Sequence, residues 1–302
     1  MPVFEAITNQ NLAEVRHYLT SGGDPNVRDS WGGTPLHAAL YEEQVSVIPM
    51  VLEAGADPNT VDDFGNTPLH LACMFGHRRV AEWLIGYGAE IDSATQNRPW
   101  TPLMTAINER YHELALWLIG QGADLNFVDP QQGWTPLLIA CDQGTSDMIL
   151  NLIERGGKVD AKLTAGDGRG RSAIHLISYF GEVDPVKALM QHGVDINQAP
   201  EGGGLTALHW SVYNKHFDLM RFLLEHDADP NAQASGIYDL RSPLHYAVAG
   251  KELPLVHSLL EYGANPRIAD SEGLTPIGMA RLALQANNSR QSRDMVAILN
   301  SY

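Results

Sequence analysis

A four-residue motif returns at nearly constant intervals along the chain and restricts the architectures it can adopt. It reads Thr-Pro-Leu-His at Thr34 and Thr67, and related forms begin at Thr101, Thr135, Ser172, Thr206, Ser242 and Thr275. The steps between successive motifs are 33, 34, 34, 37, 34, 36 and 33 residues, and a step of 33 back from Thr34 reaches Met1. Nine repeats therefore begin near positions 1, 34, 67, 101, 135, 172, 206, 242 and 275. Self-similarity at this period is typical of a solenoid.

Each repeat predicts two short helices followed by a turn-rich link. The motif Thr or Ser is a favourable helix N-cap, and Pro fits the first turn, where no N–H donor is needed. In the repeat that begins at Thr67, one helix covers 69–75 and a second places Val80, Leu84 and Ile85 on one face. Gly88 ends the second helix, because glycine tolerates the left-handed conformation found there.

This pattern resembles the ankyrin repeat over essentially all 302 residues. The resemblance implies an all-α fold: one domain over 1–302, formed by a solenoid of helix-turn-helix units with β-turn fingers. It also implies that the motif histidines brace neighbouring repeats through hydrogen bonds: His37, His70, His175, His209 and His245. The chain departs from the pattern at Met104 and Leu138, which replace the motif His, and at Asp227, which stands where Gly is usual. In the last repeat, extra residues around 285–293 precede a helix expected near 294–300.

Charge and cysteine content restrict the partners and the compartment. Asp and Glu outnumber Lys and Arg by 36 to 20, for a net charge of -16, and this disfavours nucleic acid, whose phosphates need clustered basic side chains. The two cysteines, Cys73 and Cys141, occupy equivalent core positions, so we expect buried, reduced thiols. The N-terminus shows no secretory signal, and no stretch approaches the roughly 18 apolar residues that span a bilayer. We expect a cytoplasmic monomer that does not contact membranes.

No residue pattern indicates catalysis. Apart from the five motif residues, the histidines are scattered, without the HExxH or paired CxxC spacing of a metal site. Glycine-rich runs at 166–170 and 202–204 lie inside fingers, whereas a phosphate-binding loop connects a strand to a long helix. No GxSxG motif is present. We therefore expect no enzyme activity, no catalytic residue, no metal and no cofactor.

The family resemblance places partner binding on a concave face lined by the fingers and the first helices. Equivalent positions of the repeats give a stripe of aromatic and acidic residues: Trp31, Tyr41, Phe64, Phe75, Trp100, Glu109, Trp134, Asp142, Tyr179, Phe180, Tyr213 and Tyr238. Exposed rings in a row are common anchors of protein interfaces, although the same rings are equally able to pack against the next finger and stiffen the stack. Glu42 and Asp63 add negative charge, so the matching partner carries a basic segment with apolar residues between its Arg or Lys.

Two fingers are longer than the others. The residue that ends a second helix usually precedes the next motif by 12 or 13 positions, but by 16 before Ser172 and by 15 before Ser242. Insertions in solenoids map to loops, often on the binding side. Residues 237–239 have the composition of a contact, and residues 162–171 are basic and glycine-rich.

These features favour a non-catalytic protein-protein interaction module that acts as an adaptor or a stoichiometric inhibitor through an acidic, aromatic concave face. Two alternatives remain open. One is a secreted effector that captures a host protein. The other is an anion or small-molecule binder that uses the finger from Gly166 to Arg171.

Overall fold

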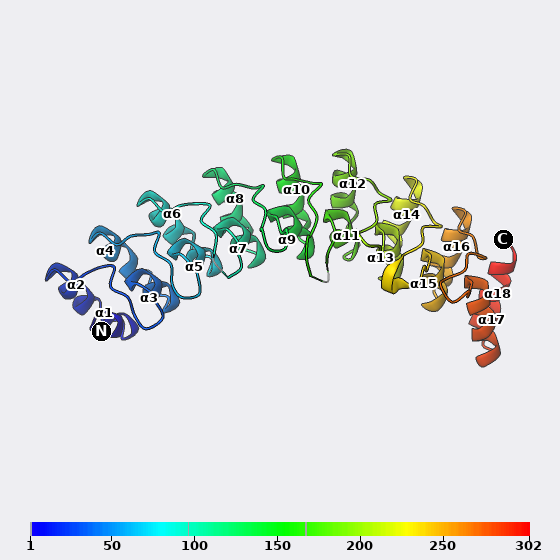
Figure 1. Cartoon of the computed structure of the whole chain (residues 1–302), viewed down its shortest axis with the longest axis horizontal. Coiled ribbons are helices and arrows are strands. Elements are labelled where there is room, and N and C mark those ends of the chain that lie inside the picture. Colours follow the sequence, from blue (N-terminus) through cyan, green and yellow to red (C-terminus); the bar gives the residue numbers. More distant parts are fainter. Residues whose placement is uncertain (1, 96, 167) are drawn as a thin grey trace. The chain divides into compact units, whose positions relative to one another are not determined.

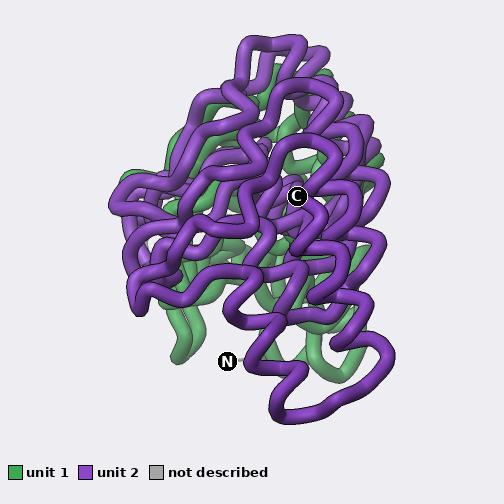
Figure 2. The backbone as a smooth tube through the Cα atoms, turned by 90° about the vertical axis from the view of Figure 1, so that its right-hand side faces the viewer, with its two compact units in different colours: residues 1–131 green, residues 132–302 purple. Residues whose placement is uncertain are grey.

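The computed structural model describes residues 2–95, 97–166 and 168–302. The chain forms two compact units, unit 1 over residues 1–131 and unit 2 over residues 132–302 (Figure 2). Helices and turns make up the described residues, which contain no strand and only two isolated antiparallel bridges, Lys162–Ser172 and Ala234–Arg241. The predicted all-α fold is thus confirmed, and the assignment of 1–302 to a single domain stays a prediction.

Unit 1 holds the first four repeats, each with two helices (Figure 1). These helices are α1 (Pro2–Thr8), α2 (Leu12–Thr20), α3 (Pro35–Tyr41), α4 (Val47–Glu53), α5 (Pro68–Met74), α6 (Arg78–Gly86), α7 (Pro102–Asn108) and α8 (His112–Gly120). The first helices of successive repeats pack together from α1 to α7, and the second helices pack together from α2 to α6. The first repeat lies where the 33-residue step placed it, with Met1 itself outside the described residues.

Unit 2 repeats this arrangement five times. Its helices are α9 (Pro136–Asp142), α10 (Ser146–Glu154), α11 (Ala173–Ser178), α12 (Val183–Gln191), α13 (Ala207–Tyr213), α14 (Phe217–Glu225), α15 (Pro243–Ala249), α16 (Leu253–Glu261), α17 (Pro276–Ala286) and α18 (Arg290–Asn300), with a 3-10 turn, η1, at Gly236–Tyr238. First helices again pack on first helices, from α9 to α17, and second helices on second helices, from α10 to α18.

The last repeat corrects one expectation. Helix α17 continues to Ala286 and α18 already begins at Arg290, so most of the insertion around 285–293 is helical. Ser289 caps α18, because its side chain accepts a hydrogen bond from the Ser292 N–H at 3.1 Å. Gln291 then donates to the carbonyl oxygen of Lys251 at 2.9 Å, which ties the start of α18 to the preceding repeat.

The motif residues begin each first helix as predicted. Thr67 is an extended N-cap whose side chain accepts from the His70 N–H, and Pro68 occupies the first turn. The His70 Nδ1 in turn accepts from the Thr67 N–H, which completes a capping box. The same box forms at all five motifs that keep the histidine: those of His37, His70, His175, His209 and His245.

The motif histidines also join neighbouring repeats. Because Nδ1 accepts a hydrogen bond, Nε2 carries the ring proton and donates it. Each Nε2 lies 2.8–3.1 Å from a carbonyl oxygen in the finger that leads into the following repeat, in turn those of Asn66, Trp100, Gln198, Arg241 and Leu274. The predicted bracing role of these histidines is confirmed.

A second set of links, which the sequence analysis did not predict, connects the turns. Asn59 donates through Nδ2 to the Gly88 carbonyl oxygen at 2.9 Å, and its Oδ1 accepts from the Glu90 N–H at 2.7 Å. Equivalent pairs of hydrogen bonds are made by Asn26, Asn197 and Asn231. Each asparagine therefore holds the end of one repeat against the turn of the next.

Both cysteines are free and fully buried, as predicted. Desolvation raises the pKa of the Cys73 and Cys141 thiols well above their usual range, so both are inert thiols within the packed helices. No helix in the described part of the chain combines the length and the apolar character needed to cross a membrane.

Candidate functional site

Two large rings stand in solvent on consecutive fingers of unit 1. Trp31 and Phe64 are 64% and 53% exposed, and their rings stack with centroids 6.2 Å apart and planes inclined by 18°. The Asp63 N–H donates to the Trp31 carbonyl oxygen at 2.9 Å, and Asn97 donates through Nδ2 to the Phe64 carbonyl oxygen at 3.1 Å. Hydrogen bonds to the Trp31 and Phe64 carbonyl oxygens therefore hold the pair, here called the Trp31–Phe64 stack, in place.

Tyr41 and Phe75 form a second pair beside α3 and α5. Their rings meet edge to face at 6.2 Å, with Phe75 half-buried. The Tyr41 hydroxyl donates to Asp62 Oδ2 at 2.8 Å, and burial together with this carboxylate raises the pKa of Tyr41 to about 12. This pair thus supports the packing of the repeats as well as presenting an edge to solvent.

Trp100 does not have the exposure expected of an interface anchor. Its side chain is only 6% exposed, because the Arg98 guanidinium lies over the ring at 3.6 Å from its centroid. Its carbonyl oxygen also accepts the hydrogen bond of His70. The alternative reading, in which a ring packs into the stack, is the correct one for Trp100.

Unit 1 carries most of the negative charge. Residues 1–131 contain 17 acidic and 6 basic side chains, a net charge of -11, against -5 for residues 132–302. Asp29 and Asp62 use their carboxylates to accept backbone N–H groups of the finger turns. Glu42, Asp63 and Glu109 extend into solvent, as predicted from the repeat register.

Edge-to-face ring contacts run through unit 2. Centroids are 5.3 Å apart for Phe180 and Tyr179, 5.7 Å for Tyr179 and Trp210, 6.2 Å for Trp210 and Tyr213, and 5.9 Å for Tyr213 and Tyr246. We call these five residues the unit 2 aromatic cluster. The sequence predicted the three exposed members but missed the half-buried Trp210 and Tyr246. Each directly follows a motif histidine, and an aromatic residue at that place is the signal that identifies them.

Two open pockets share Trp210 in their lining. The ring pocket, about 200 Å³, is lined by the first three rings of the cluster together with Asp142, Arg171, His175 and Leu176. The finger pocket, about 220 Å³, is lined by parts of three fingers, residues 169–171, 200–205 and 235–238, and includes the half-buried Tyr238. Trp210 and Arg171 belong to both pockets, and the Arg171 guanidinium lies 5.3 Å from the centroid of the Trp210 ring.

Trp134 lies outside these pockets. The ring is half-buried, and its Nε1 donates to Gln132 Oε1 at 3.0 Å within the same finger. Of the two predicted residues that directly precede a motif Thr, Trp100 is buried and Trp134 is half-buried, so neither presents a free ring.

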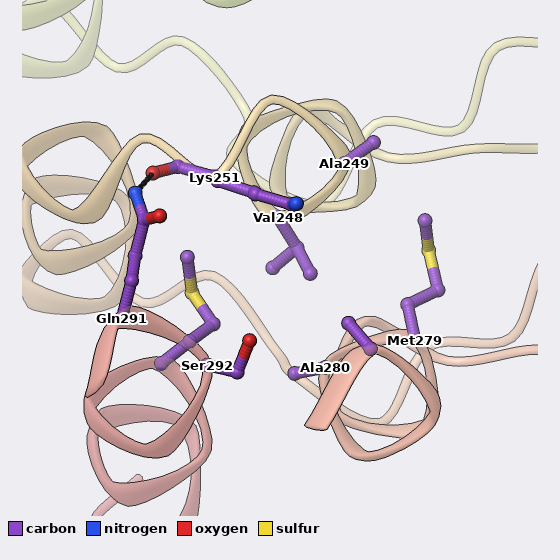
Figure 3. Close-up of a pocket in the computed structure, with 9 residues that line it drawn as sticks. Val248, Ala249, Lys251, Met279, Ala280, Gln291 and Ser292 are labelled. Carbon is purple, nitrogen blue, oxygen red and sulfur yellow. Dashed lines mark hydrogen bonds between the residues drawn. The ribbon is translucent and has the colours of Figure 1, made fainter. Parts of the chain in front are cut away.

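A smaller cavity of about 120 Å³ lies between the last two repeats (Figure 3). Val248 and Ala249 of α15, Met279 and Ala280 of α17, and Ser292 of α18 line it, and Gln291 reaches across to the Lys251 carbonyl. This cavity follows from the close packing of three helices around small side chains. Within the described residues, no group of three or more His, Cys, Asp or Glu side chains is placed to hold a metal ion.

Comparison with protein families decides the classification. A model of three consecutive ankyrin repeats matches residues 3–95, 87–164 and 158–234, and a model of the single ankyrin repeat matches residues 239–271. The chain belongs to the ankyrin-repeat family. Among solved structures, the ankyrin-repeat domain of human ASB11 is similar at 25% identity, with a TM-score of 0.63 over 77% of this chain and 98% of that chain. No curated protein matches the sequence.

Family membership gives the general role. Ankyrin-repeat proteins are generally non-catalytic modules that bind other proteins. In this ankyrin-repeat protein, the exposed aromatic surfaces are the Trp31–Phe64 stack of unit 1 and the unit 2 aromatic cluster.

Proposed function

We propose that this ankyrin-repeat protein acts as an adaptor or a stoichiometric inhibitor, and that the Trp31–Phe64 stack receives a basic segment of its partner protein. The observation that carries the proposal is the stack itself, two large rings more than half exposed on adjacent fingers. Exposed Trp is among the strongest interface anchors, because its large apolar surface loses water on binding at little conformational cost.

Charge supports a basic partner. The stack belongs to the unit with a net charge of -11, and Asp63 lies between its two rings in the sequence. The negative charge of this unit attracts Arg or Lys side chains of a partner. These side chains also stack favourably on exposed aromatic faces. An acidic surface also speeds the approach of a basic partner at low salt.

The test is capture of partners from lysate of the source cell, at low and at physiological salt, followed by mass spectrometry and calorimetry. We compare the wild-type chain with a Trp31→Ala/Phe64→Ala variant. The matched control is Leu282→Ala, which removes an equally exposed apolar side chain from α17. We expect a salt-sensitive basic protein that the double variant binds more weakly by about 2 kcal/mol or more, and the control does not.

Equal binding by the double variant contradicts the assignment to the stack. Failure to capture any protein from source-cell lysate favours the secreted-effector alternative, and the same experiment then uses lysate from candidate hosts.

A second candidate function rests on a different observation. Arg169 and Arg171 both line the finger pocket, as an anion or small-molecule binder that uses this finger requires. Asp167 of the same finger lies outside the described residues. Calorimetry with inorganic phosphate and with ATP tests this alternative, which predicts a heat of binding that Arg169→Gln removes.

A further inference from the structure

Arg169 and Arg171 line the same wall of the finger pocket. Some basic side chains of the chain form ion pairs, such as Arg78 with Glu82, Lys215 with Glu252 and Arg221 with Glu225. Within the described residues, neither Arg169 nor Arg171 has a carboxylate within salt-bridge distance. Two arginines on one pocket wall are therefore available to an external carboxylate.

Arg171 is held in place before any ligand arrives. Its guanidinium packs against Trp210, and its carbonyl oxygen accepts from the Leu163 N–H at 2.9 Å. The bridge between Lys162 and Ser172 closes the base of the same finger. A guanidinium fixed in this way loses little conformational freedom when it forms two parallel hydrogen bonds with a carboxylate.

The finger pocket exists because glycines let the fingers approach closely. A Cβ at Gly203 would collide with the Ser235 side chain, and one at Gly170 would collide with the Glu201 backbone. At the rim, Ile237 is 86% exposed, which leaves a large apolar side chain beside two arginines. A ligand that covers this rim needs apolar atoms as well as negative charge.

The ring pocket has a different character. Tyr179, Phe180 and Trp210 form apolar walls, and the neutral His175 already donates its Nε2 proton to the Gln198 carbonyl. Asp142 and Arg171 both line this pocket, so charges of both signs are present and the three rings give it its apolar character. The two pockets thus select different side chains: an acidic one at the arginines and an apolar one between the rings.

We propose that unit 2 binds an extended segment of a partner protein that places an Asp or Glu side chain in the finger pocket, against Arg169 and Arg171, and a bulky apolar side chain in the ring pocket. Alternate residues of an extended segment point to the same side about 7 Å apart, which suits neighbouring pockets that share Trp210 and Arg171. The inference rests on the proposed protein-binding function but assigns it a surface separate from the Trp31–Phe64 stack.

Glu201 and Asp239 are the carboxylates next in sequence to the residues of the neighbouring fingers that line the finger pocket. Glu201 is exposed, and Asp239 lies 4.0 Å from Arg241, which also approaches Asp270 at 3.6 Å. Their charges reduce the attraction for an acidic side chain without occupying Arg169 or Arg171. The carboxylate of the segment therefore adds binding free energy only where it reaches both arginines. This requirement determines which residue of the segment enters the finger pocket.

The experiment is a selection of random 12-residue peptides displayed on phage against the full chain, followed by fluorescence anisotropy with the selected peptides. We expect enriched sequences with Asp or Glu one to three positions from a bulky apolar residue. The Arg169→Gln/Arg171→Gln variant should bind such a peptide at least about tenfold more weakly, as charged hydrogen bonds of roughly 1.5–3 kcal/mol imply. Replacement of the peptide carboxylate by an amide should weaken binding by the same factor. When the amide peptide is tested against the Arg169→Gln/Arg171→Gln variant, the two losses of affinity should not add.

Two controls separate this site from other effects. Arg155→Gln/Lys187→Gln removes two exposed positive charges of unit 2 away from the pockets and should leave affinity within about twofold. Trp31→Ala/Phe64→Ala should also leave peptide affinity unchanged, so failure of the stack assignment is distinguishable from failure of this one. Circular dichroism confirms that each variant is folded.

Several results overturn the proposal. They are the absence of enriched peptides, enrichment without a carboxylate, equal binding by Arg169→Gln/Arg171→Gln, and no loss with Tyr179→Ala. Displacement of the peptide by inorganic phosphate or ATP, with a heat of binding of their own, identifies a free-anion site and also overturns the assignment to a protein segment.

Discussion

The Nε2 of His70 lies 3.0 Å from the backbone carbonyl oxygen of Trp100, in the finger that leads into the next repeat. Its Nδ1 accepts from the Thr67 N–H, so the ring carries its single proton on Nε2 and donates it to the finger that leads into the next repeat. Burial lowers the pKa of His70 to about 4, which keeps the ring neutral at physiological pH. A second proton on the ring would displace the Thr67 hydrogen bond.

The buried histidines make stability depend on pH. Desolvation lowers the pKa of His70, His175 and His209 to about 4, and lowers those of His37 and His245 in the same direction. Below pH 6.5 the unfolded chain binds protons that the folded chain does not, so stability is fully present above pH 6.5 and falls toward pH 4. Urea unfolding at pH 7.5 and 5.5 should differ by about 1 kcal/mol for each of the three most shifted histidines.

Replacement of one histidine isolates its share. His70→Met introduces the residue that Met104 already supplies at the equivalent position of the next repeat. This variant is less stable than the wild-type chain at pH 7.5. Between pH 7.5 and 5.5, however, its unfolding free energy should fall by about 1 kcal/mol less than that of the wild-type chain. An unchanged loss would show that His70 does not titrate as its burial implies.

Trp100 and Trp31 were both predicted as interface rings, but they should contribute differently to the unfolding free energy. Trp100→Ala removes a ring that is 6% exposed and should cost about 3–5 kcal/mol of unfolding free energy. Trp31→Ala removes a ring in solvent and should change it by about 0.5 kcal/mol or less. Denaturant unfolding of the two variants measures both, and a similar cost for each would contradict the assigned burial.

The repeat period and the family resemblance together predicted the features that recur with the motif. Helix positions, the caps at Thr67 and its equivalents, and the histidine bridges all recur with the motif, because each depends on local backbone geometry and a constant spacing. The extrapolated first repeat was recovered for the same reason, since α1 begins at Pro2.

Side-chain exposure within the fingers was harder to predict. In four of five cases the motif histidine donates to the carbonyl of the residue directly before the next motif, and these four residues are buried or half-buried. Trp100 occupies such a position and is buried, whereas Trp31 and Phe64, three residues before their motifs, point outward. This difference in exposure depends on contacts between repeats. The position of a residue within its repeat does not reveal those contacts.

Asp92 offers a stabilising substitution. It occupies the place of Asn26 and Asn59 in the preceding repeats, and its Oδ1 accepts from the Asp124 N–H at 2.9 Å. A carboxylate has no N–H to donate to the carbonyl of Gly122, the residue equivalent to Gly88. Asp92→Asn should add that hydrogen bond and raise the unfolding free energy by about 1 kcal/mol, and Asn59→Asp should lower it by a similar amount. Urea denaturation measures both, and a loss on Asp92→Asn would contradict the equivalence.

Asp227 is strained at the end of α14. Its φ of 66° falls in the left-handed region, where Gly263 and the other helix-ending glycines lie. Its negative charge also sits just beyond the C-terminus of α14, the negative end of the helix dipole. Asp227→Gly should therefore raise the unfolding free energy by about 0.5–1 kcal/mol in urea denaturation.

Two further variants separate the causes of this strain. Asp227→Asn removes the charge but keeps the Cβ. Any rise in unfolding free energy that it shares with Asp227→Gly therefore comes from the helix dipole. Gly263→Asp introduces a Cβ where no atom lies within 4 Å, so its expected cost of about 1 kcal/mol comes from backbone conformation and charge, not from collision. If Asp227→Gly destabilised the chain while Gly263→Asp left it unchanged, backbone strain at Asp227 would be disproved, because both substitutions probe the same left-handed position in equivalent turns.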